Sequence, residues 1–203
     1  MLSTFQTMPK TLRDIAGFQR WRHPIAGEAA VLLIDAQEEY RSGALALGDV
    51  TQALCEIAAL RQRAQELDLP VIHIRHIGSQ GGLFDIDAHG GTFCAEAEPL
   101  AGELVIDKRL PNAFTGTDLA AKLDALDINR IIVAGFMTHM CVSSTVRGAL
   151  DLGLEAAVIA NSCATRPLPG HDGEEISARD MHRAALAAMS DRFAHILPTS
   201  DEI

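Results

Sequence analysis

The chain has 203 residues, a formal net charge of −10 at pH 7 and a hydrophobic content of 48%. This length suits one domain with a sizeable core, and the mixed composition is typical of a globular rather than a disordered protein. The acidic charge disfavours proteins that bind nucleic acids or anionic membranes, because both functions need a basic surface.

Two further observations bear on the cellular compartment. No apolar run approaches the roughly 18 residues that a membrane span requires, and the start of the sequence lacks the apolar core of a secretory signal. The cysteines are Cys55, Cys94, Cys141 and Cys163, and none of them forms a CxxC pair. This spacing disfavours a zinc ribbon or a thioredoxin-like redox motif and favours reduced thiols. We therefore expect a cytoplasmic protein.

Predicted strands and helices alternate along the chain. In chain order they are a strand at 29–35, a helix at 51–69, strands at 71–75 and 103–108, a helix at 117–128, a strand at 130–135, a helix at 144–153, a strand at 155–161, a helix at 177–192 and a strand at 193–197. Thr51 is a candidate helix cap, Ser177 and Asp180 form a capping-box-like start, and Gly153 is a candidate helix stop. Several strands are apolar on both faces. The pattern predicts an α/β fold of three layers, with helices on both faces of a six-stranded parallel sheet.

Three chemically useful side chains lie where predicted strands end. Asp35 ends the first strand, Lys108 lies at the end of the third, and Cys141 follows the fourth, at the start of a helix. Because ligands of open α/β sheets bind outside the carboxyl ends of the strands, we expect these side chains to converge on one edge. Taken singly, each has an ordinary interpretation: a turn-forming aspartate, a solvated lysine and a small buried cysteine.

Three sequence blocks carry a resemblance to a known family. They are "VLLIDAQEEY" around Asp35, "VIDKRLPNAFTGTDL" around Lys108 and "IIVAGFMTHMCVSSTVRGALDLG" around Cys141. The chain resembles the isochorismatase-like cysteine hydrolases, a superfamily with a Rossmann-like fold that includes nicotinamidases and N-carbamoylsarcosine amidase. The resemblance spans about residues 27–198. It implies a single hydrolase domain over 1–203, with residues 1–26 as an N-terminal extension.

The resemblance also implies a catalytic triad of Asp35, Lys108 and Cys141. In such a triad the cysteine attacks a carbonyl carbon, and the aspartate takes the thiol proton and passes it to the departing amine. The Lys108 ammonium and the positive end of the helix would favour the thiolate. Water activated by Asp35 would then hydrolyse the thioester. The implied function is cleavage of a C–N bond in a small amide, carbamoyl or ureido compound.

The turn before Cys141 has a second implied role. The resemblance implies that the backbone N–H groups of Met137 and Cys141 donate hydrogen bonds to the oxyanion of the intermediate. It further implies that a cis peptide bond joins Phe136 and Met137, although neither residue is a proline.

A metal ion is a separate question. Nicotinamidase-like members bind one through a D-x-H pair and a later histidine, and this chain has no such pair at residues 40–60. The remaining candidates are His73, His76, Asp85, Asp87 and His89, which we interpret as ordinary strand and loop residues. We therefore expect no metal and no other cofactor, which also disfavours nicotinamide as the substrate.

The substrate pocket is the least constrained part. The expected lining residues are Gln37, Asn112, Phe114, Phe136, Thr138 and His171. Gln37 has an alternative role in orienting a loop. The Gly-rich, aperiodic segments 78–102 and 162–176 are expected to be functional loops. The implied partners are a small-molecule substrate and further copies of the chain, in a homodimer or homotetramer.

Two other functions stay open. One is hydrolysis of a vinyl ether, as in true isochorismatases, against which Cys141 argues because those enzymes often lack the cysteine. The other is a non-hydrolytic protein on the same fold, with a redox-responsive thiol or a role in protein interaction. Such a protein would expose Cys141 without needing Lys108 and Asp35 beside it.

Overall fold

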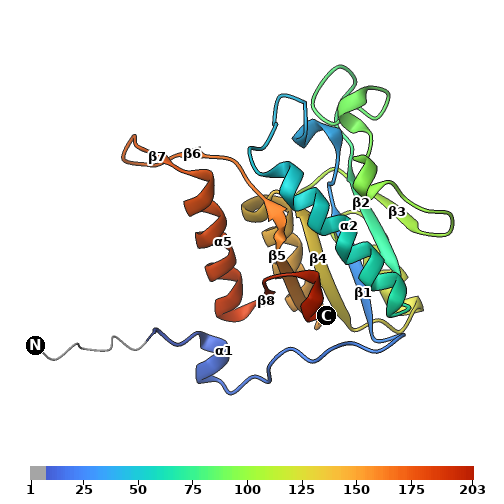
Figure 1. Cartoon of the computed structure of the whole chain (residues 1–203), viewed down its shortest axis with the longest axis vertical. Helices are drawn as coiled ribbons and strands as arrows, with labels where there is room; N and C mark the ends of the chain where they lie inside the picture. Colours follow the sequence, from blue (N-terminus) through green and yellow to red (C-terminus); the bar gives the residue numbers. More distant parts are fainter. Residues whose placement is uncertain (1–7) are drawn as a thin grey trace, which may run out of the picture.

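The computed structural model describes residues 8–203 and contains a six-stranded parallel sheet with the strand order β3-β2-β1-β4-β5-β8 (Figure 1). The strands are β1 (Ala29–Ile34), β2 (Val71–His76), β3 (Leu104–Lys108), β4 (Arg130–Phe136), β5 (Glu155–Ala164) and β8 (His195–Leu197). The helices are α1 (Leu12–Ile15), α2 (Val50–Glu66), α3 (Leu119–Ala125), α4 (Ser143–Asp151) and α5 (Ala178–Arg192). A hairpin of β6 (Leu168–Pro169) and β7 (Glu175–Ile176) projects beyond the sheet (Figure 1). The first seven residues of the expected N-terminal extension lie outside the described residues.

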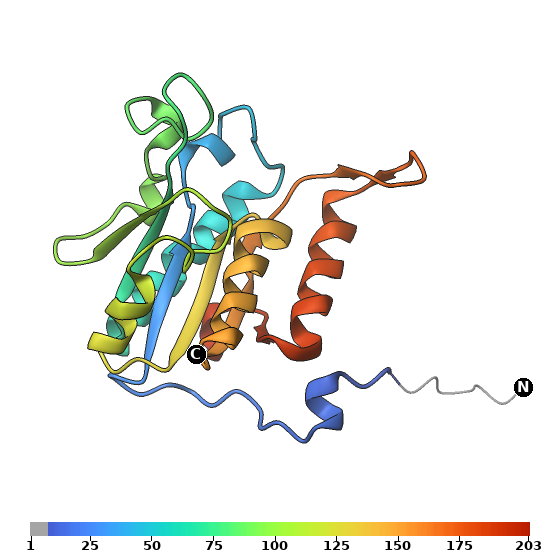
Figure 2. The same ribbon diagram turned by 180° about the vertical axis from the view of Figure 1, so that it is seen from behind.

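Helices cover both faces of this sheet. α2 packs on one face, and α3 and α4 lie on the other, with α5 beside α4 (Figures 1 and 2). Alternate residues of β1 enter different cores: Val31 and Leu33 pack on the side of α2, whereas Leu32 and Ile34 pack on the side of α3 and α4. This two-sided burial explains the continuous apolar run of the strand. The predicted three-layer α/β fold is confirmed.

The strand order changes direction beside β1. The chain runs from β1 outward to β2 and β3, and then returns to β4 on the opposite side of β1 before it continues to β5 and β8. β1 and β4 are therefore neighbours at the switch point of a doubly wound sheet, where crevices at the carboxyl ends of strands bind ligands. Both strands are buried throughout.

Every predicted strand and helix has a counterpart, but some ends differ. Ser177 caps α5 as predicted, since its Oγ accepts a hydrogen bond from the Asp180 N–H at 3.1 Å. Gly153 follows α4 with φ +78°, as predicted for a helix stop. The prediction that Thr51 caps a helix was wrong, because α2 begins at Val50 and Thr51 lies inside its first turn.

The two predicted loops contain more structure than their composition suggests. β5 continues to Ala164, into the segment predicted as a loop, because Cys163 and Ala164 pair with the end of β4. In the segment 78–102, Phe93 forms an antiparallel bridge with Gln37. These pairings join segments far apart in the chain, which a local pattern cannot reveal. None of the helices within residues 8–203 combines the length and the apolar character needed to cross a membrane.

Gly135, near the end of β4, provides a test of how closely β4 packs against β1. Its φ is +118°, and an added Cβ would lie 2.0 Å from the backbone carbonyl oxygen of Ile34 in β1. Gly135→Ala is expected to lower the free energy of unfolding by roughly 3 kcal/mol or more, because the strained φ and the backbone clash add. Urea denaturation of the purified variant measures this loss.

Gly153 provides the matched control. It also has a positive φ, but an added Cβ would meet no atom within 4 Å. Gly153→Ala should therefore cost only the conformational strain, about 1–2 kcal/mol. Equal losses at the two positions would show that no backbone clash between β4 and β1 opposes the added methyl group.

Candidate active site

Four neighbouring strands each bring one titratable side chain to the carboxyl edge of the sheet. Lys108 ends β3, His76 ends β2, Asp35 directly follows β1, and Cys141 lies in the turn after β4. β2 and β3 pair so that His76 lies opposite Lys108, and residues paired in this way point to the same face of a sheet. The structure thus brings Asp35, Lys108 and Cys141 together and adds His76 to them.

The Lys108 ammonium is the centre of this cluster. Its Nζ donates hydrogen bonds to Asp35 Oδ2 at 2.8 Å, to His76 Nδ1 at 3.0 Å and to Cys141 Sγ at 3.4 Å. These contacts use all the N–H donors that an ammonium has. The side chains of Lys108 and Asp35 are 0% exposed, whereas that of His76 is 20% exposed. His76 therefore lies closest to solvent.

Asp35 holds an unusual position. Its φ of +50° lies in the left-handed region, which aspartate tolerates better than most residues. One carboxylate oxygen, Oδ2, binds Lys108, whereas Oδ1 is buried and has no hydrogen-bond partner among residues 8–203. A carboxylate oxygen of Asp35 and the Sγ of Cys141 lie within 4.8 Å of each other. Oδ1 is therefore free to accept a proton, and the carboxylate that carries it lies close to the thiol.

The electrostatics favour a protonated thiol. Burial and then the Asp35 carboxylate raise the pKa of Cys141 to about 12, although the Lys108 ammonium acts in the opposite direction. Burial also raises the pKa of Asp35 against the influence of Lys108, which makes its carboxylate a stronger base than usual. Lys108 thus favours the thiolate, as expected, but burial and Asp35 outweigh it in the resting protein.

The turn that carries Cys141 begins at a cis peptide bond. This bond joins Phe136 and Met137, the position at which the sequence resemblance implies it. A π-helical turn, Thr138–Val142, then leads directly into α4. The backbone N–H of Met137 has no hydrogen-bond partner within the described part of the chain. It is therefore free to donate to an atom bound beside Cys141.

Two side-chain hydrogen bonds fix the same turn from outside. Thr138 Oγ1 is bonded to His182 Nδ1 of α5 at 2.9 Å, and His139 Nδ1 is bonded to Thr165 Oγ1 after β5. Thr138 was expected to line the substrate pocket, but its side chain is fully buried in this contact. Its observed role is to anchor the turn.

Gln37 organises the loop that follows β2. Its Nε2 donates to the carbonyl oxygens of His76 at 3.0 Å and Gly91 at 2.9 Å, and its Oε1 accepts from the His76 N–H at 2.8 Å. The side chain is 0% exposed. These contacts match the alternative role considered for Gln37, the orientation of a loop.

The other expected pocket residues lie in different surroundings. Asn112 accepts a hydrogen bond from the Phe114 N–H at 3.0 Å, and Phe114 packs partly buried against one hydrophobic core. Phe136 is 0% exposed and packs against Tyr40, with ring centroids 5.6 Å apart. His171 is exposed, between the strands of the projecting hairpin, so the structure does not bring it to the triad (Figure 1).

Within residues 8–203, no three of the candidate metal-binding residues come together as possible ligands of one ion. His73 is buried and bonded to Glu103 at 2.8 Å, and Asp85 accepts hydrogen bonds from backbone N–H groups of its own loop. His89 is exposed. Asp35, His76 and Cys141 lie close together, and the cation that they surround is the Lys108 ammonium.

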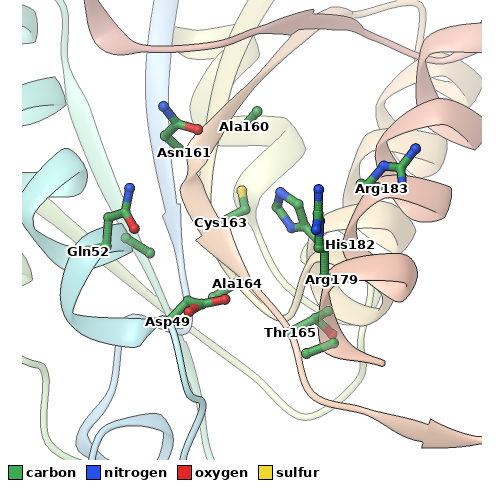
Figure 3. Close-up of a pocket in the computed structure, with 12 residues that line it drawn as sticks. Asp49, Gln52, Ala160, Asn161, Cys163, Ala164, Thr165, Arg179, His182 and Arg183 are labelled. Atoms are coloured by element: carbon green, nitrogen blue, oxygen red, sulfur yellow. The ribbon is translucent and has the colours of Figure 1, made fainter. Parts of the chain in front are cut away.

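A pocket lies beside the turn, between the first turns of α2 and α5. Figure 3 shows Asp49 and Gln52 on one side of it and Arg179, His182 and Arg183 on the other. His182 is also the partner of Thr138, so one wall of the pocket contacts the turn that carries the thiol. The expected site residues do not line it.

Sequence reasoning missed two residues near the triad. His76 was interpreted as the start of a loop, although it ends a strand beside Lys108 and the rule that found Asp35 and Lys108 applies to it equally. Tyr40 packs against Phe84, with ring centroids 5.3 Å apart. Burial is the main influence that raises the pKa of Tyr40, and the Asp35 carboxylate adds to it. No local pattern marked Tyr40.

Comparisons with known proteins show to which family the chain is similar. The family model described as the isochorismatase domain matches residues 29–201. The isochorismatase family protein YddQ of Bacillus subtilis (strain 168) is 34% identical over 173 residues, which cover 84% of this chain and 96% of that protein. Streptothricin hydrolase of Streptomyces noursei is 31% identical over 165 residues, which cover 81% of this chain and 57% of that protein.

A solved structure is similar over nearly the whole chain. The crystal structure of an isochorismatase from Pseudomonas putida KT2440 superposes with a TM-score of 0.90 and 40% sequence identity, covering 97% of this chain and 100% of that one. The resemblance that the three sequence blocks carry is confirmed. The chain therefore belongs to the isochorismatase family of hydrolases.

Proposed function

We propose that the chain is a cysteine hydrolase that cleaves a C–N bond of a small amide, carbamoyl or ureido substrate. One observation carries this proposal: a buried thiol, a buried carboxylate with a free oxygen and a lysine ammonium meet at the switch point of the sheet. Buried polar groups without partners are rare and call for a reason. A proton that moves between Cys141 and Asp35 during a reaction is such a reason.

The first half of the reaction forms a thioester. Sγ of Cys141 attacks the carbonyl carbon while Oδ1 of Asp35 accepts the thiol proton. The carbonyl oxygen becomes an oxyanion, which the backbone N–H groups of Met137 and Cys141 stabilise by hydrogen bonds. The C–N bond then breaks, and Asp35 passes its proton to the departing nitrogen. The products are an acyl group on Cys141 and a neutral amine or ammonia.

The second half releases the acid. A water molecule attacks the thioester while Asp35 accepts its proton, and the C–S bond then breaks. The thiolate of Cys141 recovers that proton, so the protein returns to its starting state. Lys108 contributes by stabilising negative charge on the sulfur whenever the proton is on Asp35, since its Nζ contacts both groups.

Two features favour this chemistry over the alternatives. Hydrolysis of a vinyl ether does not require a nucleophilic thiol, so it leaves the position of Cys141 unexplained. A thiol-based sensor would need an exposed cysteine of low pKa, whereas Cys141 is only 4% exposed and its pKa is raised. A similar protein, streptothricin hydrolase, carries a hydrolytic activity in its name.

The proposal predicts a covalent intermediate on one cysteine. Incubating the protein with a panel of small amides, carbamoyl compounds and ureides should release ammonia or amine for at least one of them. Rapid acid quenching followed by peptide mass mapping should find the acyl group on Cys141. Cys141→Ala should lower kcat by a factor on the order of 10³ or more, because it removes the nucleophile.

Cys163 provides a matched control for this experiment. It is also a buried thiol, 6% exposed, but it lies in β5 outside the triad. Cys163→Ala should keep both the turnover and the acyl adduct on Cys141. Amide turnover that persists in Cys141→Ala would contradict the thioester mechanism, and a vinyl ether as the only substrate hydrolysed would favour the isochorismatase-type reaction.

A further inference from the structure

We propose that His76 is a positioning residue, whose Nδ1 holds the Lys108 ammonium in contact with Cys141. This inference rests on the proposed function of Cys141 as the nucleophile, and it adds a residue to the implied triad. His76 would act through Lys108 rather than on the substrate.

The number of donors on an ammonium is the first argument. Nζ has three N–H groups, and Asp35 Oδ2 and His76 Nδ1 accept two of them at 2.8 Å and 3.0 Å. These two short hydrogen bonds leave the third N–H directed at Cys141 Sγ, at 3.4 Å. Without an acceptor at position 76, a buried N–H would lose its partner, and the ammonium would turn or shift to find another.

The support around His76 is the second argument. Its backbone lies in register opposite Lys108, and Gln37 binds both its N–H and its carbonyl oxygen. Its ring packs against Phe84, with centroids 4.9 Å apart. Backbone and ring are thus held by different segments, which is the arrangement expected where the orientation of a side chain matters to a site.

The protonation state of the ring agrees with this role. Accepting a hydrogen bond at Nδ1 requires the neutral tautomer that carries its hydrogen on Nε2. Burial and the positive charges of Lys108 and Arg109 lower the pKa of His76 to about 4, so the ring is neutral at neutral pH. A protonated ring would lose the acceptor and place a second cation 3.0 Å from the ammonium.

Three substitutions of His76 test whether the position of its hydrogen-bond acceptor matters, apart from the size and polarity of the side chain. His76→Asn places an oxygen close to the position of Nδ1, His76→Gln places its amide closer to that of Nε2, and His76→Leu has no acceptor. The readout is the rate of Cys141 alkylation by iodoacetamide at pH 8, measured by peptide mapping. It requires no substrate.

His76→Asn is expected to stay within about threefold of the wild-type rate, whereas His76→Gln and His76→Leu should slow alkylation about tenfold, since a weaker contact between Lys108 and the sulfur raises the thiol pKa by about one unit. If His76→Leu does not fold, the comparison of His76→Asn with His76→Gln still decides the question. A rate retained by His76→Gln and lost in His76→Asn would overturn the proposal, because the functional atom would then be Nε2.

The same substitutions in a Lys108→Met protein provide a readout that a packing role would not give. If His76 acts through the ammonium, its substitutions should have no further effect on alkylation once the ammonium is gone. Losses of equal size in both backgrounds would show that His76 acts by packing, and the positioning role would then be wrong.

Alkylation of the His76 variants in the wild-type and Lys108→Met proteins also tests this inference separately from the proposed function. If no amide of the panel is hydrolysed, the proposed function fails, while the alkylation rates still show whether His76 positions Lys108. If amides are hydrolysed, kcat should follow the alkylation rates of the three variants and KM should change little. A change confined to KM would mean that His76 contacts the substrate, and would overturn the positioning role.

Discussion

Lys108→Met is expected to lower the free energy of unfolding by roughly 3–5 kcal/mol and to slow Cys141 alkylation about tenfold or more. Methionine has a similar length and shape, so the substitution removes a charge more than it opens a cavity. The Asp35 carboxylate would then be buried without an opposite charge, because the side chains of both residues are 0% exposed. Removal of the ammonium also removes an influence that lowers the pKa of Cys141.

Urea denaturation and the pH dependence of alkylation measure the two effects separately. The control is the double variant Asp35→Asn/Lys108→Met, which removes both charges and should recover much of the lost stability while it stays inactive. Unchanged stability in Lys108→Met would mean that Asp35 takes up a proton on losing its partner. A double variant no more stable than Lys108→Met would mean that lost packing, not the unpaired charge, causes the loss.

Much of this arrangement follows from strand polarity, which is why the sequence predicts it. β1 and β4 are continuous apolar runs, and a run of this kind between helices indicates a buried parallel strand. Once the strands are parallel, their carboxyl ends share an edge, and Asp35, Lys108 and Cys141 converge without any knowledge of contacts. The sequence resemblance then implied a cis peptide bond between Phe136 and Met137, and the structure has one there.

The features that the sequence did not predict all depend on contacts between distant segments. The end of β5 is extended by its pairing with the end of β4. For Gln37 the sequence left two roles open, and the loop contact that the structure shows depends on where His76 and Gly91 fold. The strand-end rule places His76 at the same edge, but its contact with Lys108 depends on the register between β2 and β3, which is a result of folding.

The charge balance at the site could not be read from the sequence either. Spacing suggests that a lysine and a helix start favour a thiolate, but it says nothing of burial. In the structure, burial is the largest influence on both Cys141 and Asp35, and it favours the uncharged form of each. The Cys141 thiol and the Asp35 carboxyl group are two acids beside one ammonium, so ionisation of one disfavours ionisation of the other. This competition predicts that removal of Asp35 and removal of Lys108 change the thiol in opposite directions.

Asp35→Asn is therefore expected to speed alkylation of Cys141 while it lowers kcat by about 10²–10⁴-fold, as the loss of a general base does. The Asp35 carboxylate raises the pKa of Cys141, so its removal lowers that pKa, and the thiolate fraction at pH 7 grows about tenfold for each unit. Asparagine is the suitable replacement because it tolerates the φ of +50° and still offers an oxygen to Lys108. The alkylation midpoint should move to lower pH, and amide turnover should fall at every pH.

Asp107→Asn is the matched control for this prediction. Asp107 precedes Lys108 in β3, but its carboxylate is bonded to Arg75 at 2.7 Å and is more exposed, so neither rate should change. Slower alkylation in Asp35→Asn, as in Lys108→Met, would contradict the idea that the two residues oppose each other at the sulfur. Faster alkylation with full turnover would show that Asp35 only holds the thiol protonated. Only the combination of faster alkylation and lost turnover in Asp35→Asn identifies Asp35 as the group that moves the proton. In that case the thiol of Cys141 is more reactive than before, but the reaction fails because the general base is missing.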